Sequence, residues 1–260
     1  GPISGWLPDA IKKLGVRRVG FEGGDVTYNL YKQLTEVISG IEGDIKPQLV
    51  ATTDIVEALR IYKDENEMEL LSKAISIADQ AFQEVSQRLS PGMTEKAIAW
   101  ELDKCMRDLG AEATSFDTIV AAGTNGALPH HRPSERPIKE GEPIVIDMGA
   151  KYNGYCSDMT RTIILGDPDD TFNKIYDTVL AAQLTAIATV RPGMTGEEVD
   201  KLARIVIEHA GYGDKFGHGL GHGVGLQIHE SPRVSLNAQN VLEEGMPFTI
   251  EPGIYLPDWG

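Results

Sequence analysis

The most constraining feature of this sequence is a pattern that occurs twice. The tetrapeptide PGMT at positions 91–94 returns at 192–195, and each copy lies between two segments with the apolar spacing of amphipathic helices. Each pair of helices is followed by a glycine-containing strand, a histidine, a Glu-Gly-x-Pro turn and an apolar strand that ends in Asp147 or Glu251. So many features in one order indicate an internal duplication.

The duplication explains why two apolar strands end in a carboxylate. Two halves related by a pseudo-twofold axis would bring Asp147 and Glu251 together near that axis. Carboxylates placed together in a core repel each other and lose hydration, which is costly unless a cation lies between them. The sequence therefore predicts a metal site.

A predicted β-hairpin adds a further acid to this site. The Asn-Gly pair at 153–154 is typical of a two-residue type I′ turn. With this turn, Asp147 pairs with Thr160 and Asp158 pairs with Gly149, so the two aspartates are diagonal neighbours on one face. The alternative is a pair of solvent-facing acids on an edge hairpin, and the apolar neighbours of Asp147 argue against it.

A glycine-rich segment, FGHGLGHGVGLQIHE at 216–230, carries three histidines, His218, His222 and His229. Alternating glycines leave little side-chain bulk, as is needed where another group approaches closely. A single histidine is usually structural, but three beside these glycines, in the half that contains Glu251, indicate a functional site.

The remaining histidines divide by position. His130 occupies the place in the first repeat that His229 occupies in the second. We expect the adjacent His131 to lie on the protein surface beside His130. His209 lies near a predicted helix end, where a cation interacts favourably with the helix dipole, and is interpreted as structural.

Composition limits the classes of partner. The formal charge of −15 argues against nucleic acid and anionic membranes, because phosphate binding requires a cationic surface. No stretch approaches the roughly 20 apolar residues of a membrane span, and no signal peptide heads the chain. Cys105 and Cys156 form no CxxC pair, which suits a reducing compartment, so we expect a cytoplasmic protein.

Two domains are predicted, 1–62 and 63–260. The first shows a partial α/β alternation, with helical and strand-like segments in turn. Asp64 and Glu67 then form a D-x-x-E capping box at the start of a long helix, whose apolar pattern extends to Leu89.

The order of the motifs IDMG, SDMTRT, GHGLGHGVGLQIHE and IEPGIY resembles the pita-bread metallopeptidases, which include methionine aminopeptidase, prolidase, aminopeptidase P and creatinase. The resemblance covers roughly 62–260, and ALPHHRPS, DMTRT and HGVGLQIHE are most similar to the aminopeptidase P and prolidase branch. It implies an α/β (α+β) pita-bread fold with pseudo-twofold duplication. Residues 1–60 resemble the tail end of that branch's N-terminal domain, whose opening part is absent.

The resemblance also implies roles for particular residues. The metal ligands are expected to be Asp147, Asp158, His222 and Glu251. The catalytic, non-ligand histidines are expected to be His130, His218 and His229, the last two of which also bind substrate. A ligand set of mostly carboxylate oxygen with one imidazole suits two Mn²⁺ or Co²⁺ ions, with Zn²⁺ as an alternative.

The activity implied is that of a metal-dependent exopeptidase. It hydrolyses the Xaa-Pro bond at the N-terminus of peptides or in dipeptides, through a metal-bound hydroxide. Proline-containing peptides are therefore the expected partners, and a homodimer is expected because dimers are common in this branch. A creatinase-like C–N hydrolase of a non-peptide substrate is the first alternative.

One departure from the family pattern supports a second alternative. The family carries another glutamate shortly after the IEPGIY motif, and the repeat places the counterpart of Asp158 just beyond Gly260. We therefore expect a chain truncated at both ends that lacks the fifth ligand and the last strand of the pita-bread domain. Under this second alternative, the chain binds little metal and is a catalytically defective binding module.

Overall fold

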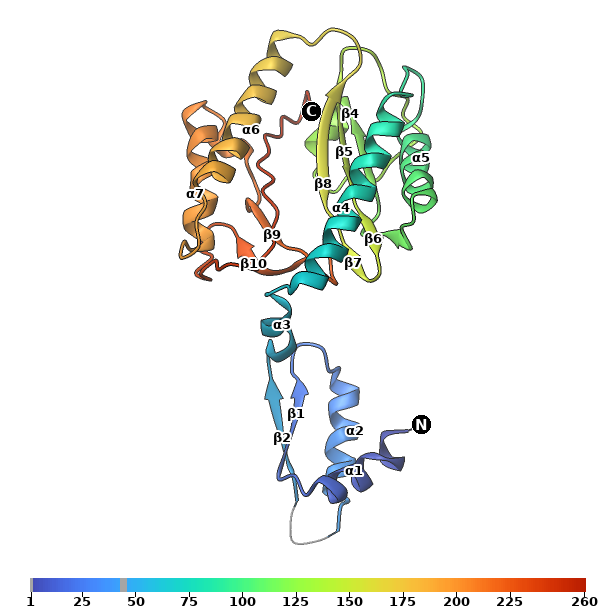
Figure 1. Ribbon diagram of the computed structural model, residues 1–260, viewed down its shortest axis with the longest axis vertical. Coiled ribbons are helices and arrows are strands. Elements are labelled where there is room, and N and C mark those ends of the chain that lie inside the picture. Colours follow the sequence, from blue (N-terminus) through green and yellow to red (C-terminus); the bar gives the residue numbers. More distant parts are fainter. Residues whose placement is uncertain (1, 43–45) are drawn as a thin grey trace. The chain divides into compact units, whose positions relative to one another are not determined.

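The computed structural model describes residues 2–42 and 46–260 (Figure 1). The chain divides into two compact units, Gly1–Leu59 and Arg60–Gly260.

The first unit is a small α/β arrangement. Strands β1 (Arg18–Glu22) and β2 (Gln48–Thr52) are parallel and are joined through helix α2 (Tyr28–Ser39), as parallel strands require a crossover. A short 3₁₀-helix η1 (Ile3–Gly5) and helix α1 (Leu7–Leu14) precede them. The helices pack on the strands through a small apolar core that includes Leu7, Ile11, Ile38 and Ile41. Helix α3 (Ile55–Arg60) follows β2.

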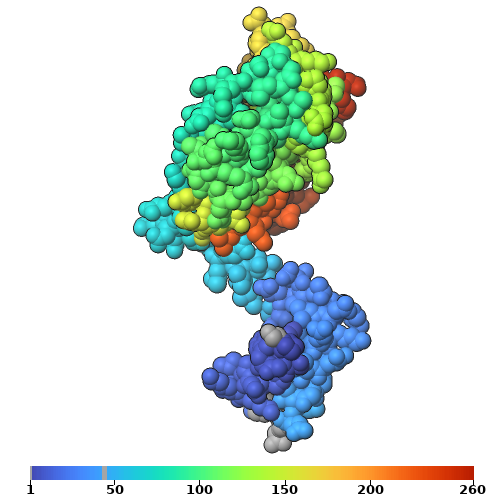
Figure 2. Space-filling view, turned by 90° about the vertical axis from the view of Figure 1, so that its right-hand side faces the viewer, coloured from blue at the N-terminus to red at the C-terminus, as the bar shows by residue number. Residues whose placement is uncertain are grey.

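The second unit consists of two halves, and the first half contains residues 61–165. Helices α4 (Glu65–Ser86) and α5 (Glu95–Asp108) cover an antiparallel sheet in the order β4-β5-β8. These strands are Ile119–Ala122, Pro143–Met148 and Met159–Ile164. A smaller sheet joins β3 (Ala113–Thr114), β6 (Ala150–Tyr152) and β7 (Tyr155–Cys156), and η2 (Gly123–Ala127) follows β4. The two helices cover the face of this half that Figure 2 shows.

The second half repeats this plan with shorter strands. Helices α6 (Asp170–Thr189) and α7 (Gly196–His209) pack together over their own apolar core. They are followed by η3 (Gly213–Lys215), β9 (Gly221–Gly223) and β10 (Glu230–Val234). In Figure 1 the helices of the two halves lie on opposite sides, and the chain's last segment runs between them.

Equivalent hydrogen bonds confirm the duplication. Thr94 caps α5 and forms a bridge with Pro137, and Thr195 caps α7 and forms a bridge with Val241. The second residue of both PGMT turns is a glycine of positive φ, Gly92 in the first half and Gly193 in the second.

The strands that end in carboxylates are equivalent as well. In the first half Ile119 pairs with Asp147. In the second half the N–H of Glu251 donates to the carbonyl of Leu220 at 2.8 Å. Both carboxylates therefore sit at the same place in their half, as the repeat predicted.

The hairpin has the predicted register. Its two turn residues have positive φ, 46° at Asn153 and 88° at Gly154, as a type I′ turn requires. Asp147 pairs with Thr160, and the Thr160 Oγ1 hydroxyl donates to Asp147 Oδ1 at 2.9 Å.

Helix α4 begins as predicted and ends earlier than predicted. The capping box is present, because Asp64 accepts from the N–H of Glu67 and the Glu67 side chain accepts from the N–H of Asp64. The helix ends at Ser86, and the N–H of Leu89 bonds to the Ser86 carbonyl as a turn. Apolar spacing thus overestimates the helix by three residues, since a turn also buries an apolar side chain.

A fully buried carboxylate, Glu95, stands at the start of α5 and accepts five hydrogen bonds. Oε1 accepts from Ala122 N and Asn125 Nδ2, both at 2.9 Å. Oε2 accepts from His131 Nε2 at 2.9 Å and from the N–H and hydroxyl of Ser134 at 3.0 and 2.7 Å. The expectation that His131 is a surface neighbour is therefore wrong, because its ring is anchored on a buried carboxylate that lies far away in the sequence.

Glu95 predicts a pH dependence of stability. Burial raises the pKa of its carboxyl group, but the five hydrogen bonds outweigh burial and lower the pKa from 4.5 to about 2. A depressed folded-state pKa stabilises the fold above pH 4.5, and this contribution is lost as the pH falls toward 2. We expect Glu95→Gln to lower the free energy of unfolding by about 3 kcal/mol at pH 7.

Urea unfolding of the parent protein and of Glu95→Gln between pH 7 and pH 2 checks this. The difference should narrow below pH 4.5, because a protonated glutamate resembles glutamine. Glu101→Gln, at a partly exposed position of the same helix, is the control and should change stability by less than about 0.5 kcal/mol. A difference that stays constant down to pH 2 would contradict the assignment.

Candidate metal centre

Three ligand-type side chains from the two halves converge on one point. Asp158 lies between β7 and β8 on the returning arm of the first-half hairpin. His222 comes from β9, and Glu251 comes from the segment that is hydrogen-bonded to β9 and the residue before it. His222 Nε2 lies 3.4 Å from Asp158 Oδ2 and 3.2 Å from Glu251 Oε1. One ligand atom from each residue lies within 4.8 Å of the others, an arrangement that could hold a metal ion.

The neighbouring groups orient these ligands. His222 Nδ1–H donates to the carbonyl of Gly223 at 3.0 Å, which leaves Nε2 facing the two carboxylates. The Thr249 hydroxyl donates to Glu251 Oε1 at 2.5 Å. Such partners fix the ring orientation and the carboxylate position before any ion binds.

Asp147 is the fourth acidic or imidazole group close to this point. Burial and the negative charges of Asp158 and Glu251 together raise the pKa of the Asp147 carboxyl from 3.8 to about 7, against the hydrogen bond from Thr160. A carboxylate whose neighbours are two other carboxylates is held near neutrality in the absence of a positive charge.

His222 places a positive charge among these carboxylates. Burial alone would lower the pKa of its imidazole, but the hydrogen bonds to Asp158 and Glu251 outweigh burial and raise the pKa to about 10. Burial raises the pKa of Glu251, while the hydrogen bonds from His222 and Thr249 lower it more. Three carboxylates around one imidazole leave excess negative charge. A divalent cation fits this donor set.

The alternating glycines allow the close approach that the sequence predicted. A Cβ at Gly221 would lie 2.0 Å from the carbonyl oxygen of Thr249, and one at Gly223 would lie 2.1 Å from that of Ser231. Only glycine therefore lets β9 run this close to the segments on both sides of His222.

His218 lies beside this centre in a defined hydrogen-bond network. Its Nδ1–H donates to the Gly219 carbonyl at 2.8 Å, and Tyr255 Oη donates to its Nε2 at 2.8 Å. Burial raises the pKa of Tyr255, and the charges of Glu251 and Asp147 add to it, so the phenol stays a donor.

His229 faces His222, with ring centroids 4.3 Å apart and an edge-on arrangement. Desolvation is the largest cause that lowers the pKa of His229. The positive charge of His222 and, to a smaller extent, that of His130 lower this pKa further, against the negative charges of Asp158 and Glu251. His130 is exposed and lies within range of this charge interaction. His209, in the last turn of α7, is exposed and belongs to no part of the cluster.

Sequence reasoning missed several residues of the site. Tyr255 and Thr249 flank Glu251 by a few positions, but nothing in their spacing shows that they donate hydrogen bonds to His218 and Glu251. The signal for the buried Asp200 was stronger, because an acid stands at a position of the α7 apolar stripe, next to Val199.

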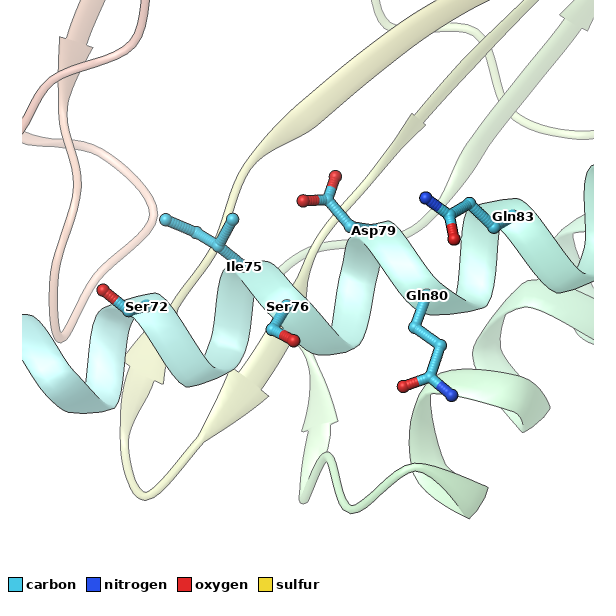
Figure 3. A pocket seen from close by; sticks show the side chains of 6 residues that line it. All are labelled: Ser72, Ile75, Ser76, Asp79, Gln80 and Gln83. Atoms are coloured by element: carbon cyan, nitrogen blue, oxygen red, sulfur yellow. The ribbon is translucent and has the colours of Figure 1, made fainter.

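A shallow surface groove lies away from this cluster. It is formed along helix α4 alone and is lined by Ser72, Ile75, Ser76, Asp79, Gln80 and Gln83 (Figure 3). None of the clustered residues contributes to it, so the candidate site is the carboxylate–imidazole centre.

Comparison with known proteins identifies the family. Residues 69–260 match metallopeptidase family M24. The chain belongs to metallopeptidase family M24. An Xaa-Pro dipeptidase from Pyrococcus furiosus is 43% identical over 255 residues, which cover 93% of this chain and 73% of that protein.

Two solved structures are also similar. The Xaa-Pro dipeptidase from Bacillus anthracis has a TM-score of 0.95 at 42% identity, over 100% of this chain and 71% of that one. The X-Pro aminopeptidase from Thermotoga maritima has a TM-score of 0.91 at 39% identity, over 100% of this chain and 72% of that one.

Membership of the M24 family and these structures confirm the pita-bread fold expected from the motifs, and they identify a metallopeptidase that uses divalent ions. Among the described residues, no helix combines the length and the apolar character needed to cross a membrane.

Proposed function

We propose that this protein is a dinuclear metal exopeptidase that hydrolyses the Xaa-Pro bond, at the N-terminus of peptides or in dipeptides. The observation that carries the proposal is the convergence of Asp158, His222 and Glu251 from two halves of one unit. The names of similar proteins support the substrate class, since they include Xaa-Pro dipeptidases and an X-Pro aminopeptidase.

The proposed ligands of the two ions include Asp147, Asp158, His222 and Glu251. Mn²⁺ or Co²⁺ suits this set better than Zn²⁺ in a structural site, because the ligands are mostly carboxylate oxygens and no thiolate is among them. Bound at these residues, the ions would act as Lewis acids on the scissile carbonyl and would lower the pKa of the attacking water.

The proposed roles of the other histidines follow from their surroundings. His229 is held beside His222 with its pKa lowered, so its imidazole is neutral at pH 7 and can accept or share a proton with substrate. His218 has its Nε2 occupied by the Tyr255 hydroxyl, so it orients substrate through this fixed network. His130 approaches from the first half, on an exposed segment that substrate can reach.

Replacing the histidines should lower turnover without changing the metal content of the protein. We expect His229→Ala and His130→Ala each to lower kcat/KM about 10²- to 10⁴-fold, the range for loss of a proton-transfer group. Bound metal, measured by elemental analysis after dialysis, should stay unchanged because neither side chain is a ligand. His209→Ala is the matched control and should change neither value. Stoichiometric metal loss in His229→Ala would show that His229 is a ligand.

A substrate comparison tests the proposed specificity. With Mn²⁺ or Co²⁺ added, the protein should release proline from an Xaa-Pro dipeptide and the first residue from an Xaa-Pro-Xaa tripeptide, and it should leave the matching Xaa-Ala peptides largely intact. Release of urea from creatine without peptide cleavage would favour the creatinase-like alternative. Metal binding without any hydrolysis would favour a binding module.

A reducing, cytoplasmic location is part of the proposal. Cys105 and Cys156 are both free and buried, as expected where no disulfide is needed. The homodimer expected from the resemblance stays a prediction.

A further inference from the structure

Both ends of the segment that carries His130 are hydrogen-bonded to the side chain of Glu95. It leaves the sheet at the end of β4, forms η2, and returns past His130 to Ser134. Glu95, which belongs to α5, accepts hydrogen bonds at both ends of this segment. His130 itself is exposed between these two anchored ends.

The two carboxylate oxygens of Glu95 bind opposite ends of this segment. Oε1 accepts from Ala122 N and Asn125 Nδ2 before His130, and Oε2 accepts from His131 Nε2 and from Ser134 after it. The N–H of Lys96 also donates to the carbonyl of Ser134 at 3.1 Å, so the first turn of α5 adds a further tie to the returning end. Because Glu95 is fully buried, these bonds do not compete with water.

The second half anchors its histidine segment in a comparable way but with other residues. On α7, Asp200 accepts from Leu220 N at 3.0 Å, and Arg204 donates to the carbonyls of Phe216 and His218 at 2.9 and 2.8 Å. Asp200 and Arg204 are themselves paired by two hydrogen bonds.

In the second half, the position equivalent to Glu95 is a glycine, Gly196. A Cβ at Gly196 would lie 2.1 Å from the carbonyl oxygen of Arg233, so no larger residue fits there. The shared fold therefore does not require a carboxylate at this place. The buried carboxylate at this place is therefore particular to the first half, where it binds the segment that presents His130.

We propose that Glu95 is a positioning residue that sets the place of His130 in the catalytic site by clamping both ends of its segment. This inference rests on the proposed function, in which His130 contacts substrate. It predicts that Glu95 acts on catalysis through His130 and not through the metal ions, because Glu95 lies outside the Asp158–His222–Glu251 cluster.

A double-mutant cycle on Xaa-Pro hydrolysis tests this. We expect Glu95→Gln to lower kcat/KM about 10- to 100-fold, as small misplacements of catalytic groups do, while bound metal stays unchanged. In a His130→Ala background the same change should have little further effect. In a His218→Ala background, where the altered histidine belongs to the other half, the two effects should multiply. Effects that multiply in the His130→Ala background would overturn the proposal.

NMR of the histidine rings gives a readout that does not depend on activity. The imidazole signals of His130 should shift and broaden in Glu95→Gln, whereas those of His209 should not move. Ser134→Ala, which removes one donor and keeps the backbone N–H, should give a smaller change of the same kind if Glu95→Gln folds poorly. Unchanged His130 signals in both variants would overturn the proposal.

The proposed role of His130 in catalysis and the positioning role of Glu95 can be disproved separately. If His130→Ala leaves peptide hydrolysis unchanged, the proposed role of His130 is wrong, while the NMR comparison still decides whether Glu95 positions the ring. If His130→Ala is impaired and Glu95→Gln is not, the proposed function stands and the positioning role is wrong.

Discussion

Replacing Glu251 by glutamine is expected to weaken divalent-metal binding by more than about 100-fold and to remove peptidase activity with it. Glu251 Oε1 lies 3.2 Å from His222 Nε2 and is held there by the Thr249 hydroxyl. Glutamine keeps the shape of the side chain but removes one negative charge and one ligand oxygen. The loss therefore reports on ligation and not on packing.

Metal titration followed by calorimetry, with Mn²⁺ and with Co²⁺, measures this effect. Glu244→Gln is the matched control, because Glu244 is exposed and lies in the turn before the same segment. It should bind metal like the parent protein. A Glu251→Gln protein with unchanged metal affinity and unchanged hydrolysis would show that the ions bind elsewhere.

The parts of the site that the sequence predicted depend on short-range rules. The hairpin register follows from a two-residue turn whose residues must both adopt positive φ, and this determines that Asp147 lies opposite Thr160. The approach of Glu251 to Asp158 and His222 follows from the repeat, which places the second-half carboxylate at the equivalent position.

The parts that the sequence did not predict depend on single long-range contacts. His131 bonds to Glu95, and Tyr255 bonds to His218, across large separations in the chain. Neither pair has a spacing or a propensity that distinguishes it from other polar residues on a surface. Only the assembled fold decides which polar side chains are buried and therefore must find a partner.

The predicted end of α4 was wrong for a related reason. An apolar residue at helical spacing, Leu89, marks a side chain that packs against the core, and both a helix and a turn can bury it. The cap at the start of the helix was predictable because Asp64 and Glu67 bond to local backbone groups. The C-terminal end has no such side-chain signal.

A second large effect, on stability and on metal binding, is expected from the single methyl group that Gly221→Ala adds. The added Cβ would lie 2.0 Å from the Thr249 carbonyl oxygen and 2.7 Å from its carbonyl carbon, far inside van der Waals contact. Because these are backbone atoms, no side-chain rotation relieves the clash, and β9 must move away from the segment that contains Glu251.

That movement separates two proposed ligands. His222 directly follows Gly221, and its backbone carbonyl accepts a hydrogen bond from Thr249 N at 2.8 Å. On the other side of the glycine, the carbonyl of Leu220 accepts from Glu251 N, also at 2.8 Å. We expect Gly221→Ala to lower the free energy of unfolding by about 1–3 kcal/mol and to abolish tight metal binding, although no ligand is changed. Gly217→Ala is the matched control in the same segment, because a Cβ there meets nothing within 4 Å. Thermal unfolding and metal titration of both variants measure the effect. If Gly221→Ala binds metal as tightly as Gly217→Ala, the close approach of β9 to Thr249 is not what brings His222 and Glu251 together.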